Sequence, residues 1–259
     1  SIFSDNTSLM VPEEARDTTF YGEPGIAFAL AGAAEYLDDP RLKDAAAVLG
    51  NRVAGRLAQA EHPSPDYLTG QVGAAALLLG YDLADDREAL LGVLDRHAQD
   101  IIAGRLEEEW WSHSGFAHGI SASIFALSRW NRQMPSEERA QHAVKILLDR
   151  LREFDNGESW ESQISGQGSR NGVWCHGTAG ISLALAAVQV WMPELSTRAD
   201  LERAVHHALH EGTGRNLTYC HGDMGTLDIL EWVIAHVPDI PDAEKIRDVL
   251  DNGYSASLL

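Results

Sequence analysis

The two cysteines of this 259-residue chain lie in the same short pattern. Cys175 and Cys220 are each followed by His-Gly, so that Cys-His-Gly-x-x-Gly occurs twice. Thiolates and neutral imidazoles are the ligands that zinc prefers, and three protein ligands with an open fourth position are typical of a catalytic site. A substrate thiol that joined such a site would be deprotonated at neutral pH. The pattern therefore predicts a zinc site that activates a thiol for addition chemistry.

The residue types leave the ligand set open. Cys175, Cys220 and one or both of His176 and His221 can supply it. A disulfide and a pair of inert core thiols are the other interpretations of two cysteines. The His-Gly that follows each cysteine favours the metal site over both.

The two patterns belong to a longer repeat. The repeat unit is Gly-x-x followed by a small residue, and an apolar run comes after it. It occurs five times, with the first glycine at Gly22, Gly70, Gly119, Gly177 and Gly222. These glycines recur every 45 to 58 residues, which leaves room for two helices and two loops in each unit. Both cysteines stand two positions before the first glycine. We therefore expect adjacent repeats to present them to the same central region.

Two kinds of helix are expected to carry the repeat. Apolar, alanine-rich runs at 26–34, 74–80 and 181–188 predict inner helices packed closely on all sides. Amphipathic segments predict outer helices at 40–58, 87–103, 136–154, 196–210 and 242–250. The polar stretch 156–171 predicts a loop. The fold class is therefore all-α, either an open solenoid or an α/α toroid of inner and outer helix pairs, and the apolar inner helices favour the ring.

Composition excludes several classes of protein. The formal net charge is −19, which disfavours nucleic acid and anionic membrane surfaces as partners. No segment has the roughly 20 apolar residues of a membrane span, and the first residues do not resemble a signal peptide. We expect a cytoplasmic protein.

Four motifs resemble those of one known family. Residues 174–181 and 220–225 resemble the zinc motifs of lanthionine synthetase C-like cyclases, and 115–119 and 66–73 resemble two further motifs of that family. The likeness spans about residues 20–236. Its closest form is the cyclase domain of class II (LanM-type) lanthipeptide synthetases.

The resemblance implies an α/α toroid with a central zinc ion. Such an enzyme closes (methyl)lanthionine thioether rings, as in lantibiotic biosynthesis, by adding cysteines of a dehydrated precursor peptide to its dehydroalanine or dehydrobutyrine residues. Carried over residue by residue, it implies the zinc ligands Cys175, Cys220 and His221.

The resemblance also implies three catalytic residues. The family's acid/base histidine matches His118, its active-site aspartate matches Asp66, and its arginine falls near Arg170. A histidine suits protonation of the enolate that thiol addition creates, because imidazole titrates near neutrality. A histidine that caps a helix turn is the alternative for His118, and an N-terminal helix cap is the alternative for Asp66.

The chain also departs from the family pattern. The repeat occurs five times, whereas the family has seven helix pairs. We therefore expect a single domain over 1–259 with an incomplete ring. We expect the final repeat and the N-terminal dehydratase domain to be absent. A dehydratase domain or protein is then an expected partner. A glutathione- or thiol-adding relative and a non-catalytic peptide-binding module with a structural zinc are the alternative functions.

A second histidine group has a plainer interpretation. His206, His207 and His210 have helical spacing within an expected outer helix. No acidic residue or cysteine accompanies them in that turn, so we expect exposed histidines rather than a second metal site.

Overall fold

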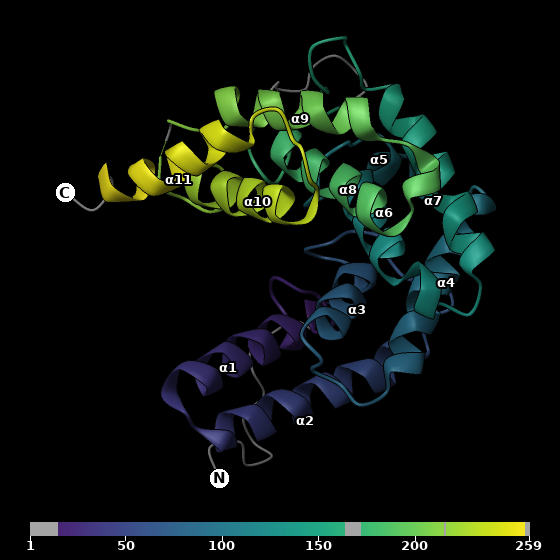
Figure 1. Cartoon of the computed structure of the whole chain (residues 1–259). Coiled ribbons are helices and arrows are strands. Elements are labelled where there is room, and N and C mark those ends of the chain that lie inside the picture. Colours follow the sequence, from purple (N-terminus) through teal and green to yellow (C-terminus); the bar gives the residue numbers. More distant parts are fainter. Residues whose placement is uncertain (1–14, 164–171, 215, 257–259) are drawn as a thin grey trace. The chain divides into compact units, whose positions relative to one another are not determined.

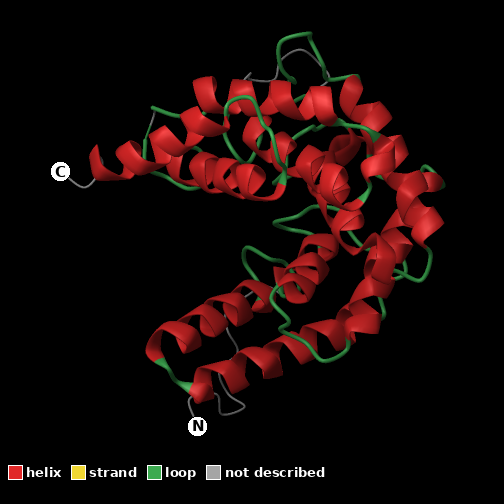
Figure 2. Cartoon of the chain, viewed as in Figure 1, coloured by secondary structure: helices red, strands yellow, loops and turns green. Residues whose placement is uncertain are grey.

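The computed structural model describes residues 15–163, 172–214 and 216–256. Within these ranges the chain is helical, and its only β-structure consists of two isolated bridges (Figure 2). The chain divides into two compact units, Ser1–His97 and Ala98–Leu259. None of the described helices combines the length and apolar character needed to cross a bilayer.

Inner and outer helices alternate along the chain, as the repeat predicts. The inner helices are α1 (Glu23–Leu37), α3 (Gln71–Gly80), α6 (Ile120–Trp130), α8 (Thr178–Trp191) and α10 (Asp223–His236). The outer helices are α2 (Pro40–Leu57), α4 (Arg87–Ile102), α7 (Glu137–Arg152), α9 (Arg198–Glu211) and α11 (Ala243–Ala256). A short helix, α5 (Glu108–Trp111), precedes α6.

Capping residues set where the outer helices begin. The Asp39 carboxylate accepts a hydrogen bond from the backbone N–H of Arg41 at 3.0 Å, and Pro40 opens α2. Proline suits this position because the first helical N–H has no partner within the helix. Ser136 caps α7 by accepting from the N–H of Arg139 at 3.2 Å. The Ser136 cap stabilises its helix by about 1 kcal/mol.

The inner helices of the first unit differ in burial. Every residue of α3 from Val72 to Leu79 is buried, which confirms the expectation of packing on all sides. In α1, by contrast, Ala27 and Ala34 are buried but the ring of Phe28 is 40% exposed. Within its unit α1 packs against α2 and α3. The expected all-round burial is therefore wrong for α1, because these neighbours cover one side of it.

In the second unit three inner helices lie side by side, α6 next to α8 and α8 next to α10 (Figure 1). Each inner helix packs against the outer helix that follows it in the chain. Helix α8 is buried on nearly all faces, including Ile181 and Leu185, because it has neighbours on every side. Full burial of such a side chain contributes about 1.5–3 kcal/mol.

The described part of the expected loop, 156–163, contains no helix and is tied to α9 and to the chain before α6. Arg203 of α9 donates two hydrogen bonds to the Asp155 carboxylate, at 2.7 and 2.6 Å, and lies 4.3 Å from the buried Trp160 ring. These bonds to the guanidinium lower the pKa of Asp155. Ser114 in turn donates to the carbonyls of Glu161 and Ser162. The loop thereby anchors the segment that leads into the His118 motif.

Candidate metal centre

The two Cys-His-Gly loops lead into the first turns of α8 and α10. Gly177 and Gly222 are the N-cap residues of these helices, and both have extended backbone. Because α8 and α10 are neighbours, equivalent loops of successive repeats come together. This contact follows from the repeat and makes a shared site possible.

Close backbone packing explains why these loops need glycine. A Cβ atom on Gly222 would lie 2.3 Å from the carbonyl oxygen of Asn216. One on Gly225 would lie 2.0 Å from the carbonyl oxygen of Tyr219, and one on Gly180 would lie 2.2 Å from that of Trp174. Real Cβ atoms do not approach so closely. The Gly-x-x-Gly pattern thus lets each loop fold back onto the helix that it opens.

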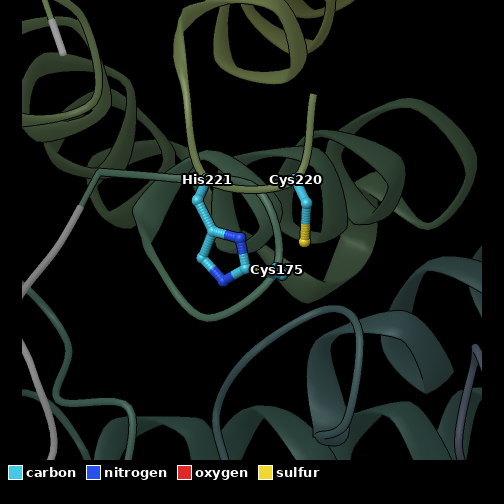
Figure 3. A group of neighbouring side chains, drawn as sticks. All are labelled: Cys175, Cys220 and His221. Carbon is cyan, nitrogen blue, oxygen red and sulfur yellow. The ribbon is translucent and has the colours of Figure 1, made fainter. Parts of the chain in front are cut away.

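Cys175, Cys220 and His221 are brought together at this point. One ligand atom of each lies within 4.8 Å of those of the other two (Figure 3). Cys175 is buried, Cys220 is half-buried and His221 is exposed, so the cluster opens toward solvent on one side. Both cysteines are free thiols, which rules out the disulfide interpretation for this structure.

The donor set fits a zinc ion. Tetrahedral zinc holds its sulfur and nitrogen ligands roughly 3.5–4 Å apart, which lies within the 4.8 Å limit that these donor atoms meet. Burial, together with the hydrogen bond to Cys220 and the charge of that neighbour, raises the pKa of the Cys175 thiol to about 12. Two adjacent thiolates are therefore unfavourable in this position without a cation. A dication at the cluster would compensate for that cost.

The two histidines that follow the cysteines are placed differently. His221 belongs to the cluster, whereas His176 is not part of any such group among the described residues. The His176 ring lies between two others, 6.2 Å from His221 and 5.7 Å from His118, measured between ring centroids. The structure therefore groups the same three residues that the family resemblance implies as ligands.

His118 is linked to the cluster through the backbone. Ala117 donates its N–H to the carbonyl oxygen of Cys175 at 3.0 Å, and a Cβ on Gly115 would lie 2.5 Å from that oxygen. The loop that carries His118 is thus packed against the loop that carries Cys175. The His118 ring is half-buried and stacks on His176 at an interplanar angle of 30°. His118 thus stacks on His176, whose ring in turn lies next to that of His221 in the cluster.

Neither of the other two expected catalytic residues lies in the described part of the second unit. Asp66 belongs to the first unit, where its Oδ1 accepts from the backbone N–H groups of Leu68 and Thr69 at 2.9 and 2.7 Å. These bonds stabilise the turn before α3, but the N-cap residue of α3 is Gly70, so Asp66 is not the helix cap of the alternative interpretation. Arg170 lies outside the described residues.

Sequence reasoning did not identify an aromatic group beside the cluster. Phe116, Trp174 and Tyr219 each stand three positions before the first glycine of their repeat. Phe116 and Tyr219 both lie 5.9 Å from Trp174 between ring centroids. The sequence signal of this group is an aromatic residue at the same position of three successive repeats.

We expect a Gly222→Ala substitution to weaken zinc binding by about 10–100-fold, the usual range for losing a group that orients metal ligands. With φ of −141°, the backbone of Gly222 is in the extended region that any residue can adopt. The effect is therefore steric, because the new Cβ must displace the segment before Cys220 and His221. Titration of the metal-free protein with zinc measures it. Gly32→Ala in α1, where nothing lies within 4 Å of an added Cβ, is the control. Equal affinities for the two variants would contradict the prediction.

Comparisons with known proteins identify a family and a fold. A family model described as lanthionine synthetase C-like protein matches residues 4–233. Among solved structures the chain is similar to a protein titled nisin cyclase, with a TM-score of 0.70 and 16% sequence identity over 93% of this chain and 70% of that chain. No curated protein matches the chain.

The structural likeness concerns the fold, because the identity is low. Nisin cyclase is an α/α toroid, so the fold class expected from the sequence is confirmed, while the expected incomplete ring stays a prediction. The family match covers most of the chain and includes both Cys-His-Gly loops and the His118 loop. This chain belongs to the lanthionine synthetase C-like family.

Proposed function

We propose that the protein is a zinc-dependent cyclase that adds cysteine thiols of a dehydrated peptide to dehydroalanine or dehydrobutyrine, forming (methyl)lanthionine rings. The observation that carries the proposal is the convergence of Cys175, Cys220 and His221. Their donor atoms suit zinc and leave a fourth position for a substrate thiol. Membership of the lanthionine synthetase C-like family supports the same reaction.

In this proposal each residue has a chemical role. Cys175, Cys220 and His221 hold the ion. Zinc, when bound, supplies the Lewis acidity that lowers the pKa of a coordinated thiol, so that a peptide cysteine is nucleophilic at neutral pH. The new carbon–sulfur bond forms at the β-carbon, and the resulting enolate must take a proton at the α-carbon. His118 donates that proton, since its ring lies one imidazole from the cluster.

Two further roles rest on the family resemblance. Asp66 orients or activates a group at the site, in addition to stabilising its own turn. Arg170 is assigned to the active site. A dehydratase domain or protein supplies the dehydrated peptide, and the reaction takes place in the cytoplasm.

The test is incubation of the zinc-loaded protein with a peptide that contains one dehydroalanine and one cysteine. Addition of S–H across the double bond changes no mass, so the expected product has the mass of the substrate but no longer reacts with a thiol-alkylating reagent. A peptide with alanine in place of the cysteine, offered with glutathione, is the control.

Two other outcomes would contradict the proposal. A gain of one glutathione in mass by the control peptide, without ring closure in the first, would identify a thiol-adding enzyme instead. Peptide that binds to the zinc-loaded protein but keeps its free thiol would identify a non-catalytic binding module.

A further inference from the structure

A second group of metal-binding side chains lies away from the cysteine loops. His206 and His210 are one turn apart on α9, with ring centroids 4.5 Å apart, and Asp242 immediately precedes α11. One ligand atom of each lies within 4.8 Å of those of the other two. The carboxylate of this group thus comes from a segment about 30 residues away.

Hydrogen bonds fix the position of Asp242 relative to α9. Its carboxylate accepts a 3.0 Å hydrogen bond from His206 Nδ1, and 20% of its side chain is exposed, against 63% for His206. Arg198, at the start of α9, donates to the carbonyl oxygens of Pro238 and Asp239, just before Asp242. Hydrogen bonds therefore join the two segments that carry the ligands.

We propose that His206, His210 and Asp242 form a second metal site for a divalent cation of borderline softness, such as Zn²⁺. Two imidazoles and one carboxylate are a donor set suited to zinc, and neutral histidines four residues apart on a helix present their ligands on one face. The site contains no thiol. Its affinity is expected to be lower than that of the cysteine centre, because thiolate is the better zinc ligand.

A lysine competes with the metal ion. Lys245, in the first turn of α11, places its Nζ 2.9 Å from Nε2 of His210. The ammonium can only donate, so this ring nitrogen carries the lone pair that a metal ion needs. Lys245 is exposed on a flexible side chain and can turn toward solvent when the ion binds. Removing its charge should therefore strengthen metal binding.

A metal ion at this site would cross-link α9 to the start of α11. Both outer helices belong to the second unit, α11 packs against α10, and Ile246 of α11 is buried. A ligand that binds the folded state alone raises its stability in proportion to the logarithm of concentration over Kd. The proposed function of the second site is thus structural, fixing the last helix pair rather than taking part in thiol chemistry.

The test is zinc titration of the metal-free full chain, with thermal unfolding as a second measurement. The unaltered protein should bind two zinc ions in two phases, the weaker of which raises the unfolding temperature by several degrees. His206→Ala should lose the weaker phase and its thermal shift, and keep the tighter one. His142→Ala, an exposed histidine on the outer helix α7, is the matched control and should keep both phases.

Lys245→Met retains the apolar stem and removes the competing charge. It should tighten the weaker phase about fivefold, as expected for removal of a unit charge about 8 Å from a divalent ion in water, once the lysine has turned aside. The proposal is overturned if His206→Ala and His142→Ala bind zinc alike, or if Lys245→Met leaves the weaker phase unchanged. Because the tighter phase depends on the cysteine centre, loss of that phase would count against the proposed function and not against the second site.

Discussion

Cys220→Ala is expected to bind zinc at the cysteine centre at least 100-fold more weakly than the unaltered chain, and to lose ring closure with it. The substitution removes one of the three proposed direct ligands, whereas loss of an indirect, orienting group alone costs about 10–100-fold. Cys220 is the better choice for the test because it is half-buried, whereas Cys175 is buried and its truncation would leave a cavity. Zinc titration and the peptide alkylation assay measure the two effects.

A histidine pair provides the matched control. His221→Ala removes a proposed ligand and should resemble Cys220→Ala, whereas His176→Ala removes the histidine at the same position of the preceding repeat and should keep the zinc. If both histidine variants lose the ion equally, the ligand set proposed here is wrong. If neither loses it, His221 is not a ligand.

The same centre should bind zinc more strongly as pH rises. The thiol of Cys175 holds its proton up to a pKa of about 12 in the metal-free protein, so the ion must displace that proton. Each proton released makes the apparent affinity rise about tenfold per pH unit below the thiol pKa. Without zinc, rising pH has the opposite effect, because it lowers the stability of the fold. The stability that comes from the raised pKa of Cys175 is complete below 9.0, the ordinary pKa of a cysteine thiol, and is lost as pH rises toward 12. Zinc should abolish this alkaline loss.

His118→Gln is expected to slow ring closure by about 100-fold or more while leaving zinc binding unchanged. General acid catalysis by a positioned side chain contributes roughly 100- to 10,000-fold, and glutamine cannot transfer the proton. Histidine as a class titrates near neutrality, so the substitution should also remove one limb of the pH–rate profile. Single-turnover assays with the dehydrated peptide across pH measure both effects.

Two results would count against this role of His118. His142→Gln serves as the control, because it makes the same change on the exposed face of α7. If His118→Gln loses zinc together with activity, the ring supports the Cys175 loop and does not act as the acid. If its rate and pH profile match those of His142→Gln, His118 has no part in the reaction.

The starts of the outer helices were predictable because their signals are local. Asp39-Pro40 and Ser136 mark the starts of α2 and α7, and each acts within one helical turn. The apolar runs predicted inner helices, and α3 and α8 are buried as expected. Burial of α1 could not be predicted, because it depends on which neighbours cover the helix and not on the composition of its own run.

The sequence by itself determined that two cysteines occupy equivalent repeat positions, each beside a histidine, and therefore that a metal site was the best interpretation. The residue types alone left His176 and His221 open, and the family resemblance implied His221. The tertiary structure brings His221 to the thiols and stacks His176 on His118, because side-chain direction depends on the lateral packing of α6, α8 and α10. It likewise brought Asp242 to the histidines of α9. Such contacts join residues far apart in the chain, and no local pattern encodes them.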